Sequence, residues 1–261
     1  MSQTKPVITI VPGGFCSPDV YAKVADILRN DGFEVLVPRL KVTESLPSKD
    51  PTTKEFKDLA SKDLPDDVQT VLADLTPLLN QGRKAVIVGH SYGSLPALLA
   101  TQGQTVEERS AKGLPGGIKA YAVVAGFAYG TRGRNVRGNL EDAPALSYFV
   151  HEEGIFHIQP AAKPLFFSDL PSEEQDIAWT SVLGSQSRKS LGYVSEFITT
   201  DLRVPQTYIL CEKDEVVPPA VQERFAAVGE FDQVEKLPTG HFPFLSSPEK
   251  TAELLKLIAT R

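Results

Sequence analysis

The chain has 261 residues, 41% of them hydrophobic and 23% charged, proportions that are ordinary for a soluble globular protein. They exclude a collagen-like or fibrous chain, and the length suits one domain with a large buried core. The formal net charge of -6 provides no basic surface, so neither a nucleic acid nor a membrane is expected as a partner.

Localisation and metal content are predicted from a few short features. The apolar run 7–11 is too short for a signal-peptide core or a membrane span, so we expect a cytoplasmic protein. The two cysteines, Cys16 and Cys211, are too few for a disulfide framework, which suits a reducing compartment. No cysteine and histidine residues have the spacing of zinc ligands, so no metal site is expected.

Short apolar runs rich in β-branched residues alternate with longer amphipathic stretches along the chain. The predicted strands are 6–12, 33–37, 84–89, 118–125, 205–211 and 232–237. The predicted helices are 18–30, 66–81, 92–102, 218–228 and 248–259. This order is typical of an α/β fold with a mostly parallel sheet of about six strands and helices on both faces.

Two stretches interrupt the alternation. Residues 38–65 are rich in proline, serine, threonine and lysine, and they predict a loop with a short helix near Phe56. Residues 127–200 combine aromatic residues, prolines and helix formers without a strand and helix rhythm. We therefore expect a mainly helical cap at 127–200, inserted into a core that is formed by 1–126 and 201–261.

The pentapeptide 89–93, Gly-His-Ser-Tyr-Gly, lies between a predicted strand and a predicted helix. A G-x-S-x-G sequence in this context holds a serine on a sharp turn, where the flanking glycines avoid clashes of Cβ atoms. We predict that Ser91 is a nucleophile and that the Tyr92 amide, at the start of the helix, faces a developing oxyanion. The alternative is a serine that only caps the helix, but a cap does not require glycine on both sides.

The loop after the first strand, Val-Pro-Gly-Gly-Phe at 11–15, is expected to supply a second oxyanion donor. Glycine lets a backbone amide point into a site, so Gly14 is the predicted donor and Phe15 the fallback. The alternative is a tight turn without a catalytic part. Cys16 follows this loop and is interpreted as a packing thiol, because no base accompanies it in the sequence.

Two later loops supply an acid and a base in the order that follows a G-x-S-x-G serine. Asp214 and His241 each come just after a predicted strand, where open α/β sheets build their sites. We predict that His241 is the general base and that Asp214 fixes its tautomer and stabilises its protonated form. Glu212 and Glu215 are the competing candidates for the acid.

Together these motifs resemble the plant methylesterase and hydroxynitrile lyase branch of the α/β hydrolases, with its fungal and bacterial relatives. The resemblance extends over nearly the whole chain. Its most specific blocks are Tyr-Ile-Leu-Cys-Glu-Lys-Asp at 208–214 and Gly-His-Phe-Pro-Phe-Leu-Ser-Ser-Pro at 240–248. It implies the α/β-hydrolase fold, a cap over the active site, no cofactor, activity on small esters and, in many members, a homodimer.

Two residues distinguish this chain from the lyases that the branch contains. Those lyases resemble the esterases but carry threonine where Gly13 stands and lysine where Phe242 stands. The favoured function is therefore hydrolysis of a small-molecule ester through a Ser91 acyl-enzyme. Two alternatives stay open: a cofactor-free lyase, cyclase or decarboxylase that uses the same site, and a non-catalytic receptor for a small ligand.

Aromatic residues near the predicted site are candidates for the substrate pocket. We expect substrate contacts from Phe15, Phe127, Phe149, Trp179 and Phe242. For the aromatic residues of the cap, packing within the cap itself is the alternative. The short cap favours a small pocket and hence a short-chain or methyl ester.

Overall fold

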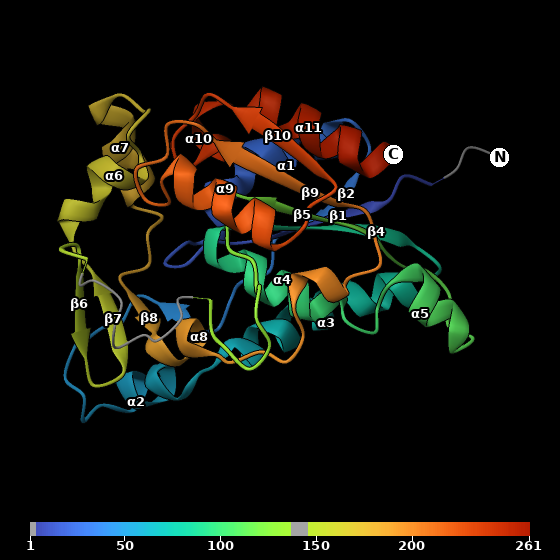
Figure 1. Cartoon of the computed structure of the whole chain (residues 1–261). Helices are drawn as coiled ribbons and strands as arrows, with labels where there is room; N and C mark the ends of the chain where they lie inside the picture. The colour runs from blue at the N-terminus through green and yellow to red at the C-terminus, as the bar shows by residue number, and fades with distance from the viewer. Residues whose placement is uncertain (1–3, 137–145) are drawn as a thin grey trace.

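The structure is a computed structural model, and it describes residues 4–136 and 146–261. Six strands form its central sheet: β1 (Val7–Val11), β2 (Glu34–Leu36), β4 (Lys84–His90), β5 (Gly117–Val124), β9 (Gln206–Cys211) and β10 (Gln233–Leu237). Their order in space is β10-β9-β5-β4-β1-β2, and every pairing is parallel (Figure 1). The six strands match the six predicted ones, which confirms the α/β class.

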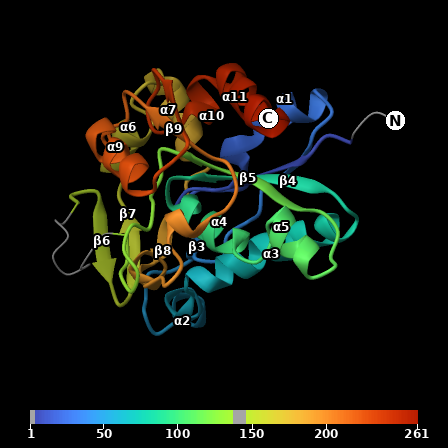
Figure 2. The ribbon, with the colours of Figure 1, turned by 45° about the vertical axis from the view of Figure 1, so that its right-hand side comes forward.

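Helices cover both faces of this sheet, because its side chains alternate between two hydrophobic layers. Along β1, Ile8 and Ile10 belong to one layer, and Val7 and Val11 belong to the other. Helices α1 (Ala22–Asn30) and α11 (Pro248–Thr260) pack together on the first face, and α3 (Leu64–Asn80) and α4 (Ser94–Thr101) on the second (Figures 1 and 2). The other helices of this part are α2 (Lys54–Ser61), α5 (Val106–Ala111), α9 (Pro219–Val228) and α10 (Pro243–Ser246).

The predicted helices are present with small shifts at their ends. The one expected at 18–30 begins as a 3-10 turn at Pro18–Tyr21 and continues as α1, and the one near Phe56 is α2. Helix α5 was not predicted. Within the described residues, no helix is long and apolar enough to cross a membrane.

A second, antiparallel sheet joins the two irregular stretches of the sequence. Its strands are β3 (Thr43–Glu44), β6 (Phe149–Glu152), β7 (Ile155–Ile158) and β8 (Ser185–Ser187), in the order β3-β8-β7-β6. The same region contains the short helices α6 (Lys163–Phe166), α7 (Ser172–Trp179) and α8 (Arg188–Gly192). The expectation of a mainly helical segment missed this sheet, because its strands are very short and one of them reads Ser-Gln-Ser, without a β-branched residue.

The carboxyl ends of the parallel strands meet at one edge of the central sheet, where open α/β sheets place their sites. The loops that follow β1, β4, β9 and β10 are therefore neighbours. The second sheet, α6 and α7 lie beside this edge (Figure 1), and the backbone of Cys16 bridges to that of Val182. This arrangement brings the predicted site residues toward one another.

Candidate active site

Ser91 follows β4 at a sharp turn whose backbone requires close packing. Its φ is 50°, in the left-handed region that a serine rarely adopts. A Cβ on Gly89 would collide with the backbone of Ser94, and a Cβ on Gly93 would collide with the carbonyls of Val11 and Pro12. The glycines thus let the chain enter α4 directly above β1, and they leave a strained, partly exposed serine at the turn.

Asp214 and His241 form a buried pair in the loops after β9 and β10. His241 Nδ1 lies 2.7 Å from Asp214 Oδ2, and His241 and Asp214 are 2% and 3% exposed. Asp214 Oδ1 accepts hydrogen bonds from the amides of Val216 (2.7 Å) and Val217 (2.9 Å). These donors fix the carboxylate, whereas the competing candidates Glu212 and Glu215 are not buried.

Ser91 and His241 line the same cavity, which has a volume of about 360 Å³. No hydrogen bond joins the two side chains among those of the described residues. Catalytic hydrogen bonds are often long in unliganded enzymes and tighten only when substrate is bound. The two groups therefore share the space in which a substrate would lie.

The cavity wall is largely aromatic. Of the predicted substrate contacts, Phe15, Phe127, Phe149 and Phe242 line it. Trp179 is not among the lining residues and instead contacts the ring of Phe166 edge-on, with centroids 6.5 Å apart. Phe166 itself lines the cavity. A wall of this kind suits an apolar group of limited size.

The loop after β1 contributes Gly13, Gly14, Phe15 and Cys16 to the cavity wall. The Gly13 amide donates to the hydroxyl of Tyr21 at 2.7 Å, so it is engaged away from the cavity. The Cys16 thiol donates to the Gly14 carbonyl at 3.2 Å, and burial raises its pKa to about 12. Cys16 is therefore protonated and unreactive, in agreement with a packing role.

No group of three or more histidine, cysteine or acidic residues in the described part of the chain is arranged to hold a metal ion. The family model of the alpha/beta hydrolases matches residues 10–254. The chain belongs to the alpha/beta hydrolase family.

Similar proteins cover three quarters or more of this hydrolase. A probable hydrolase, R7, from Phoma sp. is 29% identical over 98% of this chain and 99% of its own. Methylesterase 10 from Arabidopsis thaliana is 27% identical over 75% of this chain and 76% of its own. The crystal structure of polyneuridine aldehyde esterase superposes with a TM-score of 0.73 at 18% identity, over 98% of this chain and 100% of that one. Because the sequence identity is low, this structural similarity supports the fold alone.

A hydrogen-bond relay that the sequence did not reveal joins the Gly13 loop and the His241 loop through Tyr21 and through His90, the last residue of β4. His90 Nε2 lies 2.9 Å from the carbonyl oxygen of His241, so this nitrogen must carry the proton. His90 Nδ1 then accepts from the Tyr21 hydroxyl at 2.8 Å, and Tyr21 accepts from the Gly13 amide. Burial, together with the neighbouring His241, holds the pKa of His90 well below its usual value. The neutral His90 ring therefore connects the Gly13 and His241 loops through fixed hydrogen bonds.

A second set of buried hydrogen bonds, centred on Asp67, holds the Tyr92 side chain. Its hydroxyl donates to Asp67 Oδ2 at 2.9 Å, while Asp67 Oδ1 accepts from the amides of Lys41 (2.6 Å) and Val42 (3.2 Å). Burial raises the pKa of Asp67 to about 6. Asp67 thus connects α3, the chain that leads into β3, and the residue that follows Ser91.

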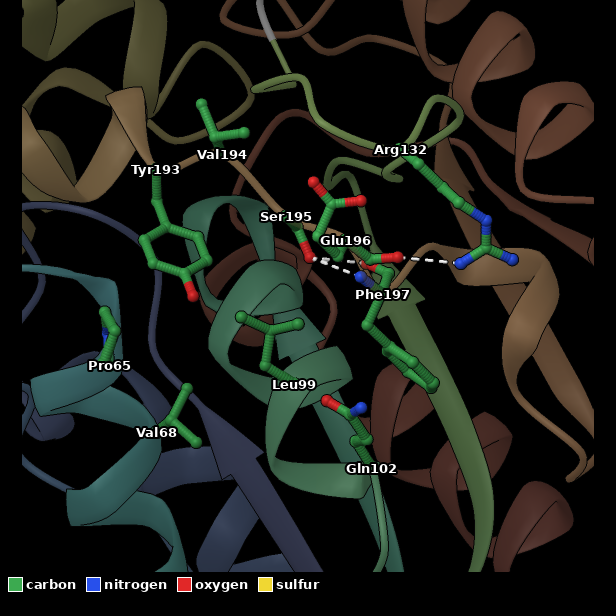
Figure 3. A pocket seen from close by; sticks show the side chains of 10 residues that line it. All are labelled: Pro65, Val68, Leu99, Gln102, Arg132, Tyr193, Val194, Ser195, Glu196 and Phe197. Carbon is green, nitrogen blue, oxygen red and sulfur yellow. Dashed lines mark hydrogen bonds between the residues drawn. The ribbon is translucent and has the colours of Figure 1, made fainter.

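A larger hollow of about 470 Å³ lies elsewhere, between α3, α4 and residues 193–197 (Figure 3). None of the predicted site residues lines it. The guanidinium of Arg132 at this hollow donates to the Glu196 carbonyl and pairs with Asp201. Ser91, Asp214 and His241 do not line this hollow, so it is separate from the candidate active site.

Proposed function

We propose that this hydrolase is a serine esterase that cleaves small carboxylic esters through an acyl-enzyme on Ser91. The observation that carries the proposal is the buried Asp214 and His241 pair, 2.7 Å apart, beside the apolar cavity that holds a serine with a φ of 50°. A structural serine cap does not need a neighbouring acid and base pair. The names of a hydrolase and a methylesterase among the relatives support the same reaction class.

In the proposed first step, Ser91 Oγ attacks the ester carbonyl while His241 Nε2 takes its proton. Asp214 keeps the other ring proton on Nδ1 and stabilises the imidazolium. The amides of Gly14 and Tyr92 bind the negative oxygen of the tetrahedral intermediate. Collapse of the intermediate expels the alcohol, which receives the proton from His241.

In the second step, a water molecule attacks the acyl group and gives its proton to His241. The acid is released as Ser91 recovers that proton. We propose that residues 127–200 act as a cap, because Phe127, Phe149 and Phe166 from this segment supply much of the apolar wall. A cavity near the lower end of the range for small-molecule pockets favours a short acyl or alcohol group.

The test is the hydrolysis of p-nitrophenyl esters from acetate to octanoate by the purified protein and by Ser91→Ala. We expect activity that decreases with chain length and that falls at least about a thousand-fold in the variant. Rates equal to those of Ser91→Ala would contradict esterase activity and favour a binding protein. Retention of most natural-substrate turnover by Ser91→Ala would favour a lyase, cyclase or decarboxylase instead.

A further inference from the structure

One polar side chain in the cavity wall has a role that the triad leaves unexplained. Gln186, in β8, lines the cavity and is only 1% exposed. Its Nε2 donates to Ser190 Oγ at 3.1 Å, but its Oε1 is buried and has no hydrogen-bond partner within the described structure. A buried acceptor without a donor is unfavourable, so it calls for a partner that the protein does not supply.

The orientation of this amide is fixed by its neighbour. Ser190 Oγ gives its own proton to the carbonyl of Ser187 at 2.8 Å, so it can only accept from Gln186. The Gln186 side chain must therefore present its NH₂ group to Ser190. Its oxygen is left facing the loop after β1.

The oxygen meets that loop at Gly14. A Cβ on residue 14 would collide with Gln186 Oε1, so the absence of a side chain at Gly14 is what makes room for the oxygen. Gly14 is also the proposed oxyanion donor. The unpartnered acceptor therefore lies next to the place where the substrate's carbonyl group would bind.

Neighbouring polar groups of the wall do not supply a donor to this oxygen. The Tyr92 hydroxyl donates to Asp67, and both ring nitrogens of His90 are engaged with Tyr21 and His241. Several phenylalanines complete the wall nearby. Gln186 Oε1 therefore has no donor within the described structure, and a group bound in the cavity can supply one.

We propose that Gln186 is a specificity-determining residue whose Oε1 accepts a hydrogen bond from a hydroxyl or N–H group close to the substrate's ester carbonyl. The preferred substrates are then short hydroxy esters or acylamino esters rather than plain alkyl esters. This inference rests on the proposed function, because Ser91 and Gly14 define where the carbonyl lies. A site built around a hydrogen bond discriminates strongly against the analogue that lacks the donor.

Matched methyl esters test the proposal. The set comprises methyl butanoate, its 2-hydroxy and 3-hydroxy derivatives, and the corresponding O-methyl ethers. The ethers keep the inductive effect of the oxygen but cannot donate. We expect kcat/KM to be at least about tenfold higher for one hydroxy ester than for its ether, and this ratio to fall to about one in Gln186→Leu.

Two further variants separate recognition from structure. Ser190→Ala removes the neighbour that orients the Gln186 amide, so the preference for the hydroxy ester is expected to weaken, whereas the hydrolysis of methyl butanoate is expected to stay within about twofold of the unaltered protein. Gln186→Met, with a side chain of similar length, gives the same readout if Gln186→Leu does not fold. The inference is overturned if the unaltered protein uses the hydroxy ester and the ether equally well. It is also overturned if the preference persists in Gln186→Leu or Gln186→Met.

Binding measurements keep this test independent of turnover. Titration calorimetry on the Ser91→Ala protein compares the Kd values of the hydroxy esters and their ethers, and the same ratio of about tenfold is expected. Ser91-dependent hydrolysis without a hydroxyl preference overturns the inference and leaves the esterase proposal intact. If no ester is hydrolysed, the esterase proposal fails, and equal Kd values then overturn the inference as well.

Discussion

Asp214→Asn is expected to abolish the base function of His241 by forcing the wrong tautomer. Asp214 Oδ1 accepts from the amides of Val216 and Val217, which only an oxygen can do. In the asparagine variant, the side-chain oxygen stays with these two donors, and its NH₂ group must face His241 Nδ1. That nitrogen then becomes an acceptor, and the ring proton moves to Nε2.

A protonated Nε2 cannot take the proton of Ser91. The corresponding change from aspartate to asparagine in a serine protease triad lowers kcat by about ten-thousand-fold, which is equivalent to about 5 kcal/mol of transition-state stabilisation. We expect a loss of the same order here. Gln222 cannot relieve the conflict, because its NH₂ group also donates to Asp214 and its oxygen accepts from the Cys211 amide.

The assay is kcat/KM for p-nitrophenyl acetate, together with thermal unfolding to show that the variant folds. Glu212→Gln and Glu215→Gln are matched controls, since neither side chain is buried and both lie in the same loop, and each is expected to stay within about twofold of the unaltered protein. The reasoning is refuted if Asp214→Asn keeps more than about a tenth of the activity, or if either glutamate variant loses it.

Three further predictions concern residues that support the site. Gly93→Ala puts a methyl group against two carbonyls and is expected to lower the free energy of unfolding by about 3 kcal/mol or more in urea titrations. The control Gly184→Ala, where a Cβ would have nothing within 4 Å, is expected to change the free energy of unfolding by less than about 0.5 kcal/mol. Equal losses in the two variants would contradict the packing argument. Because burial raises the pKa of Asp67 to about 6 in the folded state, its ionisation costs stability as pH rises from about 4 to about 7. The stability of Asp67→Asn relative to the unaltered protein is therefore expected to increase over this range by about 2 kcal/mol. A pH-independent difference between their unfolding free energies would refute this. Tyr21→Phe leaves the two groups that its hydroxyl bridges without a partner and is expected to cost about 1–3 kcal/mol in the same titrations; no loss would show that water replaces the hydroxyl.

The central sheet and the candidate triad could be predicted because each rests on a local pattern. Buried parallel strands appear as short apolar runs, and the serine turn is encoded within five consecutive residues, 89–93. Asp214 and His241 each follow such a run directly. Their positions at the carboxyl ends of strands could therefore be predicted from the sequence alone.

The missed features depend on contacts between distant segments. β3 and β8 pair only because the fold brings two polar stretches together, and neither has the alternation that identifies a strand. Tyr21 and Gln186 have no local motif, since their roles come from the groups that they meet across the fold. Trp179 was selected as an aromatic residue of the cap, but its ring contacts Phe166 and does not line the cavity.

The central claim is that Ser91 is the nucleophile, and a covalent label tests it most directly. The protein is treated with a fluorophosphonate and digested, and the modified peptide is sequenced by mass spectrometry. We predict one phosphonate on Ser91, no label in Ser91→Ala, and much slower labelling in His241→Ala. Labelling of another residue, or of none, in the unaltered protein would contradict the account.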